Sequence, residues 1–144
     1  GRVNRSWFGL LALVLVLPLA GCAGNAEEKA GPAGAVVPAS TVDHVTATHV
    51  DMKDVQFQPV QLEVKAGTIV MWTNLDDFGH TITPDDTNAW GTQGSGSDPD
   101  AYLNKNGTWA FRFDKPGTYA YHCLPHATKS TTGYIGMVGT VVVS

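Results

Sequence analysis

The chain has 144 residues, which is enough for one domain with a hydrophobic core and too few for two domains of ordinary size. Hydrophobic residues make up 43% and charged residues 15%, a composition compatible with a soluble globular fold. The formal net charge is −4 at pH 7 and the sequence has no basic stripe, which argues against a nucleic-acid partner.

The N-terminal residues have the pattern of a secretory leader. Arg2 and Arg5 precede WFGLLALVLVLPLA, an apolar run that is shorter than the ~20 residues needed to span a membrane and contains Pro18. The run ends in LAGC, where small residues directly precede Cys22, and this resembles the lipobox of bacterial lipoproteins. The resemblance implies a signal peptide over 1–21 and a lipid on Cys22, so that the exported protein is anchored to the bacterial membrane and faces the periplasm or the cell exterior. The alternative is an ordinary secretory signal cleaved nearby.

Residues 22–41 are expected to form a lipidated, flexible tether, because the stretch is rich in Ala, Gly and Pro and has no apolar period. The folded domain is then expected over 42–144. With Cys22 bound to lipid, Cys123 is the remaining thiol, and no intramolecular disulfide is expected. A lone exported thiol is prone to oxidation unless it is buried or bound to a metal.

Short runs of alternating apolar residues, separated by Gly and Pro turn signals, predict strands throughout this domain. In chain order we expect strands at 45–50, near Phe57, near Leu62 and Val64, and at 68–74, 108–113, 118–123 and 137–143. The polar stretch 85–100 is expected to be a surface excursion. No window has the period of a long amphipathic helix, so the pattern predicts an all-β fold, an antiparallel sandwich or barrel.

Four side chains could converge as metal ligands. Cys123 and His126 are three positions apart, so that one tight loop supplies two ligands. Met137 begins the closing strand, and His80 lies in the loop that follows the strand at 68–74. Two imidazoles, a thiolate and a weak axial thioether suit both Cu(II) and Cu(I), so the set predicts a single copper ion.

Three stretches resemble cupredoxins of the plastocyanin and amicyanin type, and they are FQPVQLEVKAGTIVMWTNLDDFGHTI, KPGTYAYHCLPH and GMVGTVVV. The resemblance covers about Val50 to Val143. It implies a Greek-key antiparallel β-sandwich and a copper ion bound by His80 Nδ1, Cys123 Sγ, His126 Nδ1 and Met137 Sδ. It also implies a monomeric electron carrier, not an enzyme, which passes single electrons from a redox protein donor to an acceptor by Cu(II)/Cu(I) cycling.

Two features differ from the family pattern. Ten residues, ATKSTTGYIG, separate His126 from Met137, where relatives have only a few. We expect these residues to bulge outward and leave Met137 in place; the alternative is an axial position that is empty or filled by a carbonyl or water. The second difference is Thr81, directly after His80, where relatives often carry an Asn that ties the two ligand loops together.

The remaining histidines and methionines fit the copper site less well. Strand alternation turns His122 away from the thiol, so it is expected at the surface or beside the ligands. His44 and His49 have no companion cysteine and are expected to be solvated. Met52 and Met71 are weaker candidates than the methionine of the closing strand, because Met52 lies far from the cluster in sequence and Met71 alternates away from Trp72, toward the outer side of its strand.

Partner docking is expected around the edge of His126, with Asp76 and Asp77 at the margin of an apolar patch. The residues assigned to this patch are Phe78, Leu124, Pro125, Tyr134 and Ile135.

Two other classes of function use copper, namely copper delivery and copper-dependent catalysis. The main alternative is a module that binds copper and delivers it to a cuproenzyme, but the three methionines are scattered and not clustered, which favours the carrier. A copper enzyme of the multicopper kind would need additional domains and histidines. A binuclear centre would need two cysteines in the ligand loop, which has one.

Overall fold

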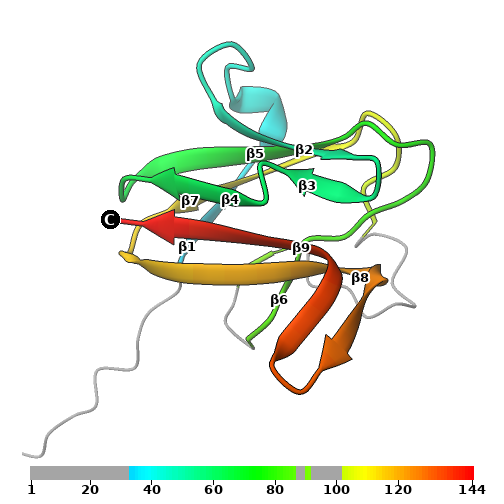
Figure 1. Cartoon of the computed structure of the whole chain (residues 1–144). Helices are drawn as coiled ribbons and strands as arrows, with labels where there is room; N and C mark the ends of the chain where they lie inside the picture. The colour runs from blue at the N-terminus through cyan, green and yellow to red at the C-terminus, as the bar shows by residue number, and fades with distance from the viewer. Residues whose placement is uncertain (1–32, 87–89, 92–101) are drawn as a thin grey trace, which may run out of the picture.

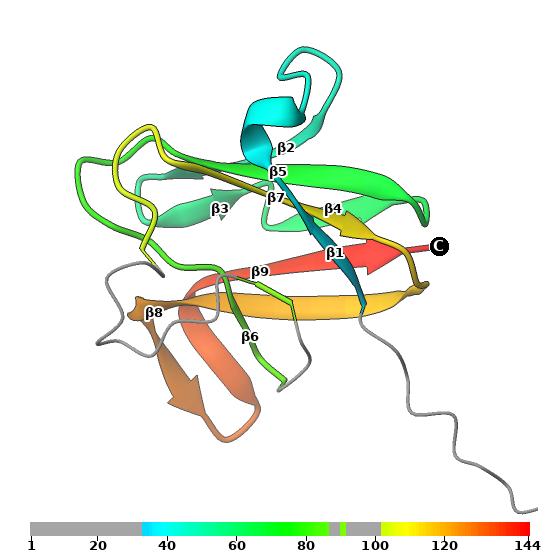
Figure 2. The same cartoon turned by 180° about the vertical axis from the view of Figure 1, so that it is seen from behind.

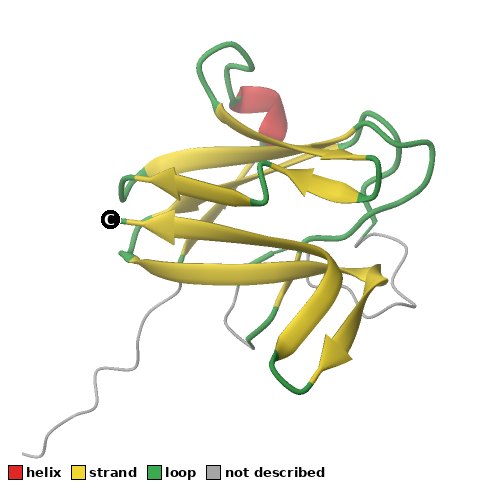
Figure 3. Cartoon of the chain, viewed as in Figure 1, coloured by secondary structure: helices red, strands yellow, loops and turns green. Residues whose placement is uncertain are grey.

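The computed structural model describes residues 33–86, 90–91 and 102–144. In this part of the chain nearly all regular structure is β-strand, with one short 3-10 helix (Figure 3). The elements are β1 (Gly34–Val37), η1 (Ala39–Thr41), β2 (Thr48–Lys53), β3 (Gln56–Gln58), β4 (Gln61–Val64), β5 (Thr68–Asn74), β6 (Thr83–Pro84), β7 (Thr108–Phe113), β8 (Gly117–Ser130) and β9 (Gly133–Val143). No helix among the described residues is long and apolar enough to cross a membrane.

The strands form two sheets that pack face to face, as the two layers in Figure 1 show. One sheet has the order β1-β7-β5-β2-β3 and the other has the order β4-β9-β8-β6. The predicted all-β sandwich is therefore confirmed. The expectation of purely antiparallel sheets is wrong for two pairs, because β2–β5 and β4–β9 are parallel. In the β2–β5 pair, the chain crosses to β4 in the second sheet before β5 returns to lie beside β2 in the first.

Aromatic rings fill the space between the sheets. The alternation of β5 turns Val70 and Trp72 inward, and the Trp72 indole donates a hydrogen bond of 3.1 Å to the buried Tyr121 hydroxyl of β8. The two rings meet edge to face, with centroids 5.8 Å apart. Since β5 belongs to one sheet and β8 to the other, this pair joins the layers and fixes their relative position.

The first described strand lies where a flexible tether is expected. Residues 34–37 form β1, which pairs with β7 in the register Gly34↔Phe113 to Val37↔Ala110. A side chain at position 34 would meet the Arg112 carbonyl oxygen at 1.7 Å, so the glycine allows this close pairing. The folded domain therefore begins before residue 42, and residues 22–32 of the expected tether lie outside the described residues.

The strand expected from residue 45 begins three residues later. Val45 is 91% exposed. The Asp43 carboxylate accepts the Val45 N–H at 2.9 Å, and this hydrogen bond stabilises a turn at these residues. β2 starts at Thr48.

The polar stretch at 85–100 is largely outside the described residues, but Trp90 within it is buried. Its ring packs on Phe113 with centroids 5.4 Å apart. At this position the expected surface excursion returns to the core.

The ten residues between His126 and Met137 extend the β8–β9 pair into a hairpin. Residues 127–130 pair with residues 133–136, and this hairpin projects beyond the sandwich in both views (Figures 1 and 2). The outward bulge expected from the sequence is thus an ordered extension of two strands.

Candidate metal centre

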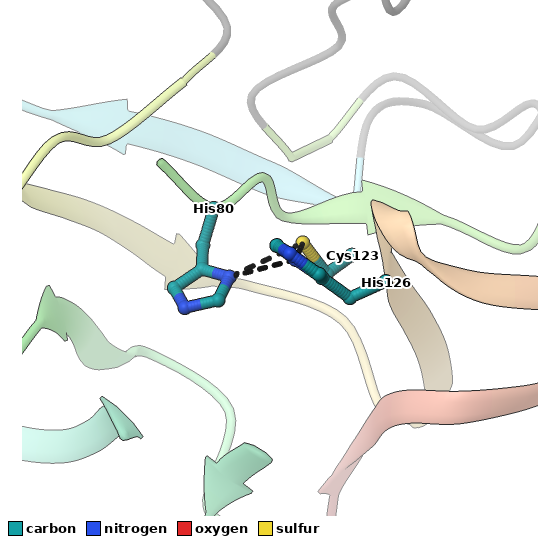
Figure 4. A group of neighbouring side chains, drawn as sticks. All are labelled: His80, Cys123 and His126. Atoms are coloured by element: carbon teal, nitrogen blue, oxygen red, sulfur yellow. Dashed lines mark hydrogen bonds between the residues drawn. The ribbon is translucent and has the colours of Figure 1, made fainter. Parts of the chain in front are cut away.

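Three predicted ligands converge at the hairpin end of the sandwich. His80, Cys123 and His126 have their ligand atoms within 4.8 Å of one another (Figure 4). Cys123 Sγ lies 3.5 Å from His80 Nδ1 and 3.3 Å from His126 Nδ1, and the two Nδ1 atoms are 3.2 Å apart. The nitrogens that face the thiol are therefore the Nδ1 atoms, as the resemblance implies.

His80 is held in place by the loop that follows β5. Its backbone exchanges two hydrogen bonds with Leu103, of 3.1 and 2.8 Å. The buried Asn74 amide, at the end of β5, donates to the carbonyl oxygens of Phe78 and Leu103 at 2.7 Å each. These bonds fix the backbone on both sides of the loop and thereby position His80.

Cys123 and His126 flank a bulge in β8. Pairing with β9 is regular up to His122↔Val138 and resumes at Ala127↔Gly136, so residues 123–126 lie opposite Met137 alone. Met137 is buried, in the same core cluster as Cys123. The insertion therefore lengthens the sequence between the ligand loop and Met137 without moving Met137 away from the loop.

A glycine makes the return of β9 possible. Gly136 has φ = 104°, and a side chain there would meet the His126 carbonyl oxygen at 2.5 Å. The residue directly before Met137 must therefore be a glycine for the strand to lie this close to the ligand loop.

Thr81 joins the two ligand loops. Its backbone N–H donates to Cys123 Sγ at 3.3 Å, and its hydroxyl accepts the Leu124 N–H at 2.8 Å. The Thr81 hydroxyl also lies 2.9 Å from that of Thr83. The hydroxyl thus makes the link between loops for which relatives often use Asn.

His122 is buried and does not lie at the surface. Its Nδ1 is 2.7 Å from an Asp85 carboxylate oxygen, and its ring stacks on Tyr134 with centroids 3.6 Å apart and an interplanar angle of 12°. As expected from alternation, the ring faces away from the site. It connects β8 to the hairpin through Tyr134.

Burial favours the neutral forms of two side chains at the site, Cys123 and His126. Burial raises the pKa of the Cys123 thiol, although hydrogen bonds from Thr81 and the His126 backbone oppose the shift. Burial lowers the pKa of His126, and the nearby His80 lowers it further, whereas Asp76 acts in the opposite direction. A buried neutral thiol beside two imidazoles suits a metal ion that displaces the thiol proton.

The His80 ring has a carboxylate on its outer side. Its Nε2 lies 2.8 Å from Asp76 Oδ2. Burial favours the neutral form of Asp76, but hydrogen bonds from His80 and from the Val55 and Asp54 backbones outweigh it and hold the pKa of the carboxyl below its usual range. From the sequence, Asp76 is expected only at the margin of a docking patch, and no local signal indicates its contact with His80.

The residues assigned to the docking patch are all partly or fully exposed. Phe78 is 47% exposed and packs against the His126 ring at 5.4 Å; Leu124, Pro125 and Ile135 are also partly or fully exposed. Tyr134 is partly exposed as well, and its ring stacks on the buried His122.

His44, His49, Met52 and Met71 lie on or next to strands of the sheet that does not contain Cys123. His49 Nε2 is 2.8 Å from the His44 carbonyl oxygen, near the start of β2. Met52 and Met71 belong to β2 and β5, in the opposite sheet from the strands that carry Cys123 and Met137.

Comparison with known proteins agrees with this geometry. Residues 44–144 match the family model described as copper binding proteins of the plastocyanin/azurin family. The chain is 32% identical to amicyanin-alpha of Methylorubrum extorquens over 118 residues, which cover 80% of this chain and 90% of that protein. It is 35% identical to plastocyanin of Scenedesmus fuscus over 89 residues, covering 60% and 85% of the two chains.

Solved structures give the same result. The reduced Cu(I) form of an amicyanin variant superposes with a TM-score of 0.56 and 27% identity, covering 76% of this chain and 92% of that one. The donor set also fits the metal, since two imidazoles and a thiolate form the trigonal part of a blue-copper site. The chain therefore belongs to the plastocyanin/azurin family of copper-binding proteins; it is a cupredoxin whose cofactor is a single copper ion held at His80, Cys123 and His126.

Proposed function

We propose that this protein carries single electrons between two larger redox proteins. The observation that carries the proposal is a donor set in which two of the three donors, His80 and Cys123, are fully buried and held by hydrogen bonds of the protein itself. Bound copper supplies one-electron chemistry by alternating between Cu(II) and Cu(I). Because the two buried donors are fixed by the protein, little rearrangement accompanies a change of charge, and this favours rapid transfer.

Met137 is proposed as the axial fourth ligand through its Sδ atom. The support is its register opposite residues 123–126 and its burial in the same core cluster as Cys123. A weak thioether at this position suits both oxidation states.

Docking of the redox partners is proposed at the edge of His126. This ring is the partly exposed one of the two histidine ligands, since His80 is fully buried. Phe78, Leu124, Pro125 and Ile135 surround this end with apolar surface of the kind that transient partners contact. Tyr134, which is partly exposed and stacks on His122, is proposed as a further member of the patch.

Voltammetry and copper transfer test the proposal together. We expect a reversible one-electron couple and retention of Cu(I) when a soluble Cu(I) chelator is added. The proposal would be contradicted if Cu(I) passed to the chelator faster than the protein exchanges electrons with a small redox mediator. That result would favour copper delivery.

Docking is tested by Leu124→Asp and, as a matched control, Val60→Asp, which places the same charge at an exposed apolar position on the β3–β4 connection. We expect the first variant alone to slow electron transfer with a purified redox partner. Equal rates in both variants would exclude docking at this end.

A lipid anchor on Cys22 is also proposed, with residues 1–21 as the signal peptide and the domain, a monomer, outside the cytosol. The support is the LAGC sequence after a short apolar run. Two acyl chains give stable anchoring at ~0.8 kcal/mol per buried methylene. Mass spectrometry of the N-terminal peptide from a bacterial host should detect a diacylglycerol on Cys22, and an unmodified cysteine or its absence from the mature protein would contradict the anchor.

A further inference from the structure

We infer that Asp76 is a positioning residue that couples the copper ligand His80 to the turn between β2 and β3. Asp76 Oδ2 lies 2.8 Å from His80 Nε2. The same carboxylate accepts the backbone N–H of Asp54 on Oδ1 at 2.9 Å and that of Val55 on Oδ2 at 3.0 Å. One side chain thus holds a metal ligand and a turn that is more than twenty residues away in sequence.

The turn at Asp54 and Val55 has a backbone that needs this support. Both residues have positive φ, 56° and 57°, as the two central positions of a type I′ hairpin require. Asn-Gly or Asp-Gly normally occupies such a turn, and a β-branched residue in this conformation is unusual. The two N–H groups point at one carboxylate, which offsets the strain at Val55.

The contact with His80 prepares the ring for the metal. An ionised carboxylate only accepts hydrogen bonds, so the hydrogen bond between the two side chains places a proton on His80 Nε2. Nδ1 of the same ring faces Cys123 and His126 and is the nitrogen that would hold copper. A carboxylate behind a ligating histidine also makes the imidazole a stronger donor.

Asp76 is itself fixed in position. Its backbone N–H donates to the buried Asn74 side chain at 2.9 Å, and its own side chain is 11% exposed. The negative charge near the copper is therefore poorly screened by water, and it favours Cu(II) over Cu(I).

Asp77 offers a matched control for this charge. It is the next residue, its side chain is 83% exposed, and it forms an ion pair with Lys105 instead of a contact with a ligand. Asp76→Asn and Asp77→Asn remove the same charge one position apart in sequence, but only the first touches His80.

The inference rests on the proposed electron-transfer function for its redox readout, and the test therefore has a second, copper-free readout. In the copper-loaded protein, we expect Asp76→Asn to raise the reduction potential and to lower Cu(II) affinity by about tenfold or more. A tenfold change in the preference for Cu(II) over Cu(I) corresponds to ~59 mV for a one-electron couple. Asp77→Asn should change both quantities much less.

In the copper-free protein, nitrogen NMR of the His80 ring should show the Nε2–H tautomer in the wild type and a mixture of tautomers in Asp76→Asn. The unfolding midpoint of Asp76→Asn should also fall, because an amide replaces one of the two accepting oxygens. Adding Val55→Gly should recover the midpoint by relieving the turn, without restoring the potential. That separation distinguishes a role toward copper from a purely structural role.

Equal potentials and the same His80 tautomer in the wild type, Asp76→Asn and Asp77→Asn would overturn the inference. Full recovery of the potential by Val55→Gly would also overturn it, because the effect would then be structural. A wild-type protein without a one-electron couple would contradict the proposed function, while the tautomer and the unfolding midpoint would still decide the role of Asp76.

Discussion

The two halves of the β8–β9 pair differ in burial and in what holds them. From Gly117↔Val143 to His122↔Val138 the ladder is regular, and its inner side chains, such as Tyr121 and Val141, are buried in the core. Beyond the bulge, residues 127–136 form a hairpin in which Ile135 is 60% exposed. The ligand loop, residues 123–126, lies between these halves and follows directly after the buried ladder.

This difference explains how the chain accommodates an insertion next to a metal site. Cys123 and Met137 are fixed by the buried ladder, and the added residues extend the same two strands away from the sandwich (Figure 2). Register is strongly specified where one face of a strand is buried and weakly specified where both faces are solvated. The ligand positions should therefore be insensitive to changes in the hairpin and sensitive to changes in the loop itself.

Cys123→Ser should have the largest effect. Removing the thiolate should abolish the intense visible absorption of the Cu(II) protein, since a serine hydroxyl does not replace a soft sulfur donor. Ala127→Ser, the first residue of the hairpin ladder, is the control and should leave the absorption unchanged. An equally blue Cys123→Ser protein would show that the thiol is not a ligand.

Thr81→Val should destabilise the link between the loops while preserving side-chain volume. The Leu124 N–H would lose its acceptor, at a cost of about 1–3 kcal/mol in the free energy of unfolding of the copper-free protein. Thr81→Ser keeps the hydroxyl and should lose much less. Urea unfolding measures both, and equal stability of the Val and Ser variants would mean that the hydroxyl is not the link.

Met137→Leu tests the axial position separately from packing. We expect the copper-free protein to change by less than about 1.5 kcal/mol, because the two side chains have similar volumes. The spectrum and reduction potential of the copper protein should nevertheless shift. Met52→Leu, at an equally buried position in the opposite sheet, should leave both unchanged. If Met137→Leu is also without effect, the axial ligand lies elsewhere.

Shortening the hairpin should have the smallest effect on the metal. Replacing residues 128–135 by Asn-Gly joins Ala127 to Gly136, which already face each other, through a two-residue turn. The visible and electron paramagnetic resonance spectra should remain those of the full-length protein. Loss of the blue site on shortening would show that the hairpin, and not the buried ladder, sets the ligand geometry.

The ligands could be predicted from the sequence because the copper chemistry restricts both residue types and spacing. Cys123 and His126 share one loop, and His80 follows a strand with clear alternation. The strand 34–37 could not be predicted, since its four residues lie in a stretch rich in Ala, Gly and Pro and have their strand partner, β7, more than seventy residues away in sequence. Tertiary pairing overrides local propensity in such cases.

Other features depend on contacts between residues far apart in the chain. Asp76 contacts Asp54 and Val55 only because the turn between β2 and β3 lies beside the loop that follows β5. No local pattern in the sequence indicates this. The stack of Tyr134 on His122 likewise depends on the hairpin register. The chemistry of the site was therefore readable in the sequence, whereas the contacts that support it required the fold.

The most direct test of the central claim is the visible absorption and electron paramagnetic resonance spectrum of the protein with one equivalent of Cu(II). A thiolate–imidazole site with Met137 in place predicts an intense blue band with narrow copper hyperfine splitting. A pale spectrum with wide splitting would contradict the account, because it would mean that Cys123 does not bind the metal.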